Sequence, residues 1–262
     1  MYIGFFNVNK PKGMTSAAVV GRLKRILNQK GLGHMGTLDP MAEGVLPIAA
    51  GRPATRMFDA LRAKKKEYVA EFTFGISTDT LDTTGQITQS GGRIPAKTEI
   101  EAALPSFIGR ISQLPPDYSA KSVNGARAYD LARRGQETNL KPVEIDVYEY
   151  ELLCPANAAP EGIGVCEYEL PSAANAAPDS AGGSAARRGA YTFRVLCGGG
   201  TYIRALARDL GAALGTHCVM SALTRTRSGC FHIGDARTLD EIAAAPAAAL
   251  VSVEWVAEAI RE

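Results

Sequence analysis

The sequence lacks the features that mark several common protein classes. No apolar run approaches the ~18 to 20 residues of a membrane-spanning helix, and the start has no basic stretch followed by an apolar one, as a secretion signal would have. The three histidines and five cysteines show no ligand spacing typical of zinc, and there is no Cys-x-x-Cys pair. We therefore expect a cytoplasmic protein with reduced cysteines, no membrane contact and no metal.

Charge is almost balanced overall but is distributed unevenly. The net charge is only +2, yet residues 1–70 contain twelve Lys and Arg against four Asp and Glu, whereas residues 231–262 contain two against six. A basic region of this kind can supply phosphate contacts to a nucleic acid. A solvated surface is the other interpretation, and charge alone does not separate the two.

Residues 31–48 form the most informative segment of the chain. They contain one carboxylate, Asp39, among glycines at 31, 33, 36 and 44 and prolines at 40 and 47. Pro40 fixes its own φ and pushes Asp39 out of the helical region, and nearby apolar residues can attach the segment to a core. We expect an irregular but ordered loop that presents Asp39 and His34, an arrangement typical of an active site.

Alternating side chains and helical spacing indicate the secondary structure. Alternation predicts strands over 67–75, 143–153, about 165–170 and 190–197. Helical spacing predicts a helix over 17–28 capped by Ser16, a second that starts with a Thr98 and Glu101 capping box and breaks near Pro105, and a third capped by Thr201. The irregular order of strands and helices predicts an α+β fold, with a mixed sheet flanked by helices.

Residues 155–189 differ from the rest of the chain in composition. They are rich in Ala, Pro, Gly, Ser and Asn, which gives them little apolar surface to bury. We expect a low-complexity insert here, an enlarged connection between two strands, and assign it no function.

The segment around Asp39 resembles the catalytic motif of the TruB family, the tRNA pseudouridine-55 synthases. Every fixed position of the pattern Gly-His-x-Gly-x-Leu-Asp-Pro-x-Ala-x-Gly-x-Leu-Pro is met between Gly33 and Pro47. Four further blocks match in order, at residues 9–16, 66–68, 116–121 and 200–204. The resemblance covers roughly residues 3 to 240. It implies the pseudouridine synthase fold, with a mixed, mostly antiparallel sheet.

The resemblance also implies a domain organisation. Residues 1–240 would form the catalytic domain, and residues 241–262 a short helical extension. Many family members carry a further RNA-binding PUA domain, for which the residues after Phe231 are too few. Recognition of the target would then depend on the catalytic domain.

Three residues are candidates for the chemistry. Making pseudouridine requires a nucleophile, a pocket for the detached base and a group that accepts the C5 proton. The resemblance makes Asp39 the nucleophile, attacking either C1′ of the sugar or C6 of the base, and Tyr68 the aromatic that stacks on the flipped uracil and takes the C5 proton. A carboxylate in a dry pocket needs a cation nearby, and Arg204 is our candidate. A turn aspartate, a core tyrosine and an exposed arginine are the alternatives.

Three more residues are expected to bind the substrate. By resemblance, His34 supports the RNA after the base leaves its stack, Tyr202 contacts the substrate, and Leu223 closes the uracil pocket. Each could instead be an ordinary packing residue. Thr224 departs from the Leu-Arg-Arg that family members often show here, which puts one phosphate or structural contact in doubt.

The function implied is isomerisation of uridine to pseudouridine at position 55, in the T arm of tRNA. Such an enzyme would need no cofactor or metal, would flip the base, and would act on the T stem-loop, by default as a monomer. Two other hypotheses remain: an RNA-binding or tRNA-folding protein without catalysis, and a carboxylate-dependent hydrolase that releases free base from nucleosides.

Overall fold

One large mixed sheet organises the protein. The computed structural model describes residues 1–119, 121–123, 125–153 and 189–261. In sheet order the strands are β14 (Leu250–Val251), β1 (Gly4–Lys10), β3 (Glu43–Ala50), β12 (Cys218–Ser228), β4 (Lys66–Phe74), β11 (Ala190–Cys197), β10 (Val143–Leu153) and β7 (Gly109–Gln113). β3 and β12 pair in parallel, and the other strand pairs of the described sheet are antiparallel. The predicted mixed, mostly antiparallel sheet is confirmed.

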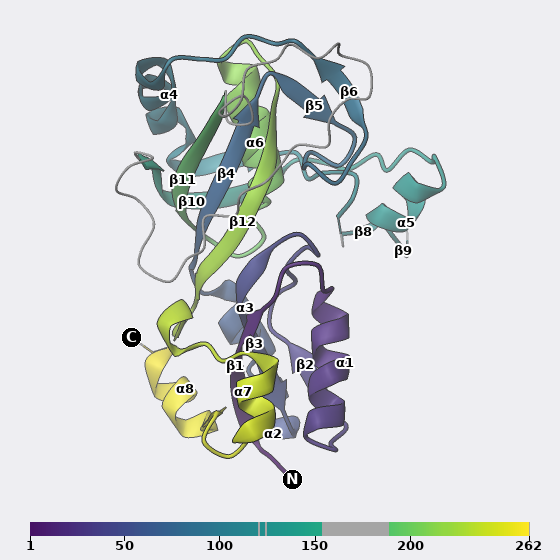
Figure 1. The fold of residues 1–262 in the computed structure, drawn as a ribbon, viewed down its shortest axis with the longest axis vertical. Helices are drawn as coiled ribbons and strands as arrows, with labels where there is room; N and C mark the ends of the chain where they lie inside the picture. Colours follow the sequence, from purple (N-terminus) through teal and green to yellow (C-terminus); the bar gives the residue numbers. More distant parts are fainter. Residues whose placement is uncertain (120, 124, 154–188, 262) are drawn as a thin grey trace, which may run out of the picture.

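Short strands extend this sheet and form two small hairpins. β2 (Leu32–His34) pairs with β3, and β13 (Phe231–His232) pairs with β12. Separate two-stranded sheets join β5 (Ile76–Thr78) to β6 (Ile87–Ser90) and β8 (Ser122–Val123) to β9 (Ala126–Arg127). The β8–β9 hairpin and the helix after it project from the body of the molecule (Figure 1).

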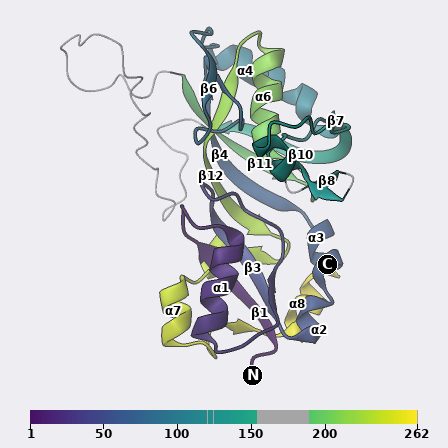
Figure 2. The same cartoon turned by 90° about the vertical axis from the view of Figure 1, so that its right-hand side faces the viewer.

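Helices flank the sheet in two groups. α1 (Ser16–Ile26), α2 (Arg52–Thr55), α3 (Phe58–Ala63), α7 (Leu239–Ala244) and α8 (Val253–Ala259) lie in the lower half of Figure 1, with both chain ends. α4 (Lys97–Ala103), α5 (Ala128–Arg133) and α6 (Ile203–Ala213) lie in the upper half. Figures 1 and 2 show β4 and β12 connecting the two halves. No helix in the described ranges is long and apolar enough to cross a membrane.

The strands predicted from alternation are found where the structure describes them. β10 and β11 have the predicted limits, and β4 begins and ends one residue earlier than predicted. The strand expected at about 165–170 and the insert at 155–189 fall in residues 154–188, outside the described residues, except for Gly189.

The helices form as predicted, but the three predicted caps are wrong. Thr15 caps α1 by accepting a hydrogen bond from the Ala18 amide. At α4, the Glu99 carboxylate accepts from the amide of the N-cap residue Ala96, so the helix starts at Lys97, one residue before Thr98. Pro105 ends α4 as expected, in a 3₁₀ turn over Leu104–Phe107.

Thr201 does not cap α6, because its hydroxyl donates to the Gly198 carbonyl and Tyr202 takes the N-cap position. Ser16 does not cap α1, because its side chain points inward. The Ser16 hydroxyl is buried and bonds both backbone groups of Leu38, accepting from the amide and donating to the carbonyl, each at 2.9 Å. Local sequence shows which residues can cap a helix, and tertiary contacts decide which of them do.

Two apolar clusters cover the two faces of the β1–β3 region. Phe6 and Val8 of β1 belong to the main core, whereas Phe5 lies in a second cluster, because successive strand residues point to opposite faces. The second cluster includes Met35 and Val45, which flank the segment around Asp39. Packing therefore holds this segment on both sides.

The double bond between Ser16 and Leu38 predicts a measurable stability effect. In Ser16→Ala both backbone groups of Leu38 lose a buried partner, so the free energy of unfolding should fall by about 1–3 kcal/mol. Thr98→Ala, at an exposed helix position, is the matched control and should change it by less than about 0.5 kcal/mol. Urea titration of the two variants measures both values. Equal stability would show that this contact does not hold the segment.

Candidate active site

Asp39 lies in an irregular segment between two strands. We define the catalytic loop as residues 35–42, which follow β2 and precede β3. The prediction of irregular structure over all of 31–48 is partly wrong, because its two ends form strands. The loop itself matches the prediction: it is ordered, and it leaves the Asp39 side chain 34% exposed.

The N-terminal residues hold the catalytic loop from below. The Gly13 amide donates to the Pro40 carbonyl at 2.7 Å, and the Lys10 ammonium donates to the carbonyls of Pro40 and Ala42 at 3.3 and 2.5 Å. Burial lowers the pKa of Lys10 to about 8, against the opposing effect of the Asp39 charge. Lys10 and Gly13 thus bind the backbone after Asp39, and Ser16 of the same family motif binds Leu38 before it.

Arg204 forms an ion pair with Asp39. Its Nε lies 2.9 Å from Oδ2 of Asp39, and its side chain is 7% exposed. The other two guanidinium nitrogens donate to the carbonyls of Thr80 and Tyr118, at 2.9 and 3.0 Å. These three contacts fix the guanidinium, so the cation expected near Asp39 is present in a single orientation.

A second carboxylate, Asp82, also faces Arg204, and the sequence analysis missed it. Oδ2 of Asp82 lies 3.7 Å from Nε of Arg204, and the residue is buried. Its Oδ1 accepts from the Thr80 hydroxyl at 2.8 Å and from the Thr84 amide and hydroxyl at 2.9 and 2.5 Å. The run Thr80-Leu81-Asp82-Thr83-Thr84 was the available signal, because short hydroxyl side chains around an acid indicate a carboxylate bound locally.

Tyr68 lies on β4 with its side chain directed into the protein. It is 8% exposed, and burial raises the pKa of its hydroxyl. The positive charge of the Arg225 guanidinium, on the neighbouring strand β12, opposes this effect on the pKa. The charge of Asp39 also acts on Tyr68, so Tyr68 belongs to the same electrostatic cluster.

His34 ends β2, directly before the catalytic loop. Burial lowers the pKa of its imidazole, and the positive charge of Arg225 lowers it further. Both effects favour the neutral ring at pH 7. Its Nδ1 is buried and has no hydrogen-bond partner among the residues that the structure describes.

The remaining candidates lie on the elements that carry this cluster. Leu223 is buried on β12, two residues before Arg225. Tyr202 precedes α6, and both of its backbone groups bond the side-chain amide of buried Gln113. The Thr224 hydroxyl donates to Glu43 at 3.2 Å, so the residue that departs from the family pattern contacts β3.

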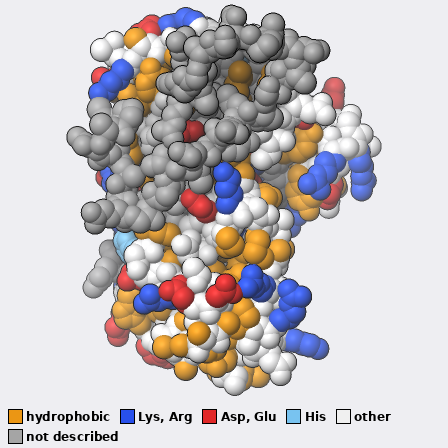
Figure 3. Space-filling model, in the orientation of Figure 1, with side chains coloured by type: hydrophobic (Ala, Val, Ile, Leu, Met, Phe, Trp, Pro, Cys, Tyr) orange, Lys and Arg blue, Asp and Glu red, His pale blue; other side chains and the backbone are white. Residues whose placement is uncertain are grey.

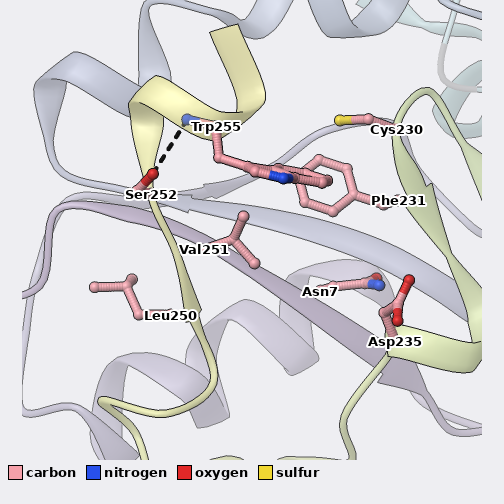
Figure 4. Close-up of a pocket in the computed structure, with 8 residues that line it drawn as sticks. All are labelled: Asn7, Cys230, Phe231, Asp235, Leu250, Val251, Ser252 and Trp255. Atoms are coloured by element: carbon pink, nitrogen blue, oxygen red, sulfur yellow. Dashed lines mark hydrogen bonds between the residues drawn. The ribbon is translucent and has the colours of Figure 1, made fainter. Parts of the chain in front are cut away.

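A separate hollow lies away from this cluster. Figure 4 shows its lining, which comes from β1, β13, β14 and α8 and includes Phe231, Val251 and Trp255. Its volume is about 490 Å³, and none of its lining residues belongs to the Asp39 cluster. The described part of the chain contains no group of three or more His, Cys, Asp or Glu placed to hold a metal.

Basic side chains gather on two outer surfaces. Arg22, Lys24 and Arg25 lie on α1, and Arg127, Arg133 and Arg134 lie on or beside α5. Figure 3 shows lysine and arginine side chains over both regions. α1 leads directly to the segment that holds Asp39. Its basic side chains are therefore placed to contact the phosphates of an RNA bound there.

Known proteins resemble this chain over most of its length. Residues 24–161 match the family described as TruB family pseudouridylate synthase (N terminal domain), and residues 204–258 match the tRNA pseudouridylate synthase B C-terminal domain. The tRNA pseudouridine synthase B of Syntrophomonas wolfei is 43% identical over 240 residues, which cover 91% of this chain and 71% of that relative. That of Acaryochloris marina is 40% identical, covering 92% and 73%.

Solved structures agree with the sequence comparison. A Cbf5-Nop10-Gar1 complex contains a chain that is 29% identical with a TM-score of 0.67, and the alignment covers 98% of this chain and 62% of that one. An H/ACA RNP bound to a substrate RNA containing 2'-deoxyuridine gives a TM-score of 0.59 at 29% identity, covering 92% and 53%. The fold is that of the pseudouridine synthases, and the chain belongs to the TruB family of pseudouridylate synthases.

Proposed function

We propose that this protein isomerises uridine to pseudouridine in the T arm of tRNA, at position 55, with Asp39 as the nucleophile. The observation that carries the proposal is the 2.9 Å ion pair between Asp39 and the buried Arg204, in a loop that matches the family motif at every fixed position. The relatives named tRNA pseudouridine synthase B support the substrate class.

The arrangement suits a reaction that breaks one glycosidic bond and forms another. The C1′–N1 bond breaks, the uracil turns, a C1′–C5 bond forms, C5 loses a proton and N1 gains one. Arg204 pairs with the Asp39 carboxylate and orients it for attack at C1′ or C6. Tyr68 lies where its ring can stack on the flipped base, a contact worth about 1–3 kcal/mol.

The other predicted residues take supporting roles in this proposal. His34, neutral and at the edge of the loop, contacts the RNA where the base has left the stack. Tyr202 and Leu223 border the uracil. The Lys and Arg side chains of α1 and α5 bind RNA phosphates, whatever the nucleotide sequence. Residues 1–240 act as the catalytic domain, and residues 241–262 extend it. The protein works as a cytoplasmic monomer without a cofactor or metal.

The direct test is to map pseudouridine in an unmodified tRNA transcript by carbodiimide labelling. The wild-type protein, without added metal or nucleotide, should produce one modified site in the T loop. Asp39→Asn keeps the size of the side chain but removes the nucleophilic charge, so it should produce none. Wild-type protein that binds the tRNA without modifying it would contradict the proposal and favour a tRNA-folding role.

The arginines on and beside α5 provide a second test, which concerns RNA binding. Replacing Arg133 and Arg134 together with Ala removes two candidate phosphate contacts, so KM should rise about tenfold with little change in kcat. Steady-state kinetics on the same transcript measure both constants. Arg261→Ala, an exposed arginine near the end of α8, is the control and should leave KM unchanged. A fall in kcat at unchanged KM would contradict this role for α5.

A further inference from the structure

Arg225 is a buried charge that the proposed chemistry does not yet use. It lies on β12, and its side chain is 1% exposed. Its Nε donates to the Val45 carbonyl at 2.7 Å and its Nη2 to the Gly36 carbonyl at 3.1 Å. One acceptor precedes Asp39 and the other follows it, so the guanidinium joins the two sides of the catalytic loop.

The same guanidinium reaches Tyr68. Arg225 and Tyr68 are directly paired residues of β12 and β4, and the charge of the Arg225 guanidinium acts on the phenol. The pairing places the Tyr68 side chain beside the guanidinium that bonds both sides of the loop that carries Asp39.

Arg225 differs from Arg204 in its partners. Arg204 faces two carboxylates, Asp39 and Asp82, whereas no acidic side chain among the described residues forms an ion pair with Arg225. A buried cation without a carboxylate partner is costly, and it favours the ionised form of an acidic group beside it. Tyr68, whose hydroxyl is such a group, lies directly opposite Arg225 on the neighbouring strand β4.

Three groups with charge or a titratable proton act on Tyr68. They are Arg225 from β12, Cys197 from β11 and Asp39 from the catalytic loop. Burial raises the pKa of Tyr68, Cys197 and Asp39 raise it further, and Arg225 is the group that lowers it. Removing the Arg225 charge therefore leaves only influences that favour the neutral phenol.

We propose that Arg225 is a positioning residue that places the Tyr68 side chain against the catalytic loop, beside a buried positive charge, so that Tyr68 can accept the C5 proton. This inference rests on the proposed isomerase function. Tyr68 first loses its own proton to water. The phenolate oxygen then takes the proton from C5, the electron pair of the C5–H bond returns to the uracil ring, and a neutral phenol remains.

The test is the pH dependence of the single-turnover rate of isomerisation. In the wild-type protein the rate should rise with pH, because the ionised fraction of Tyr68 rises. In Arg225→Gln the rising part of the pH–rate profile should move to higher pH by about one unit or more. The rate at pH 7.5 should then fall about tenfold. Arg227→Gln, two residues along the same strand, is the matched control and should not change the pH at which the rate rises.

A double-substitution comparison separates positioning from general support of the fold. If Arg225 acts through Tyr68, adding Arg225→Gln to Tyr68→Phe should not lower the isomerisation rate further. Long incubations measure the slow rates of these variants. The proposal would be overturned if Arg225→Gln lowered the rate by the same factor with Tyr68 and with Phe at position 68. That result would show that Arg225 only supports the structure.

A titration without substrate keeps the inference testable even if isomerisation is not observed. Carbon-13 NMR of protein labelled at tyrosine Cζ identifies the Tyr68 resonance by its absence from Tyr68→Phe. Its midpoint should lie at higher pH in Arg225→Gln than in the wild type, and near the wild-type value in Arg225→Lys, which keeps the charge. Equal midpoints in wild type and Arg225→Gln would overturn the inference. A wild-type protein without isomerase activity would instead contradict the proposed function.

Discussion

The parallel pairing of β3 with β12 is the contact on which the candidate site depends. β3 follows the catalytic loop, and β12 also pairs with β4, so β12 connects the loop of Asp39 to the strand of Tyr68. Gly44 permits this contact, because a side chain there would meet the Arg225 carbonyl at 2.4 Å. β12 also binds the segment of Asp82, through backbone bonds from Met220 to Leu81 and from Thr83 to Met220. One strand thus aligns residues from distant parts of the sequence.

The two buried arginines of the site have different electrostatic roles. Arg204 is neutralised by Asp39 and Asp82, so it fixes a carboxylate without adding much net charge. Arg225 bonds the carbonyl oxygens of Gly36 and Val45, and its positive charge lowers the pKa of His34. The same charge opposes the rise that burial causes in the pKa of Tyr68. Burying either cation is costly, and the many backbone acceptors around them offset that cost. Each guanidinium is therefore held by several acceptors on different segments of the chain.

The sequence was informative where a local pattern determines structure. Alternation located β4, β10 and β11, and the motif between Gly33 and Pro47 located the loop of Asp39. β3 was missed because Gly44 and Pro47 argue against a strand, although tertiary pairing forms one. Ser16 and Arg225 were missed for a related reason. A serine before a helix normally caps it and an arginine is normally exposed, and only the fold shows that both are buried.

The central claim is that this site isomerises uridine without releasing the base. The most direct measurement uses a tRNA transcript whose uridines carry tritium at C5. Forming the C1′–C5 bond expels the C5 hydrogen, so the account predicts tritium in water, no free uracil, and no release by Asp39→Asn. Labelled free uracil would identify a hydrolase and contradict the account. Full retention of tritium in the tRNA would contradict it as well.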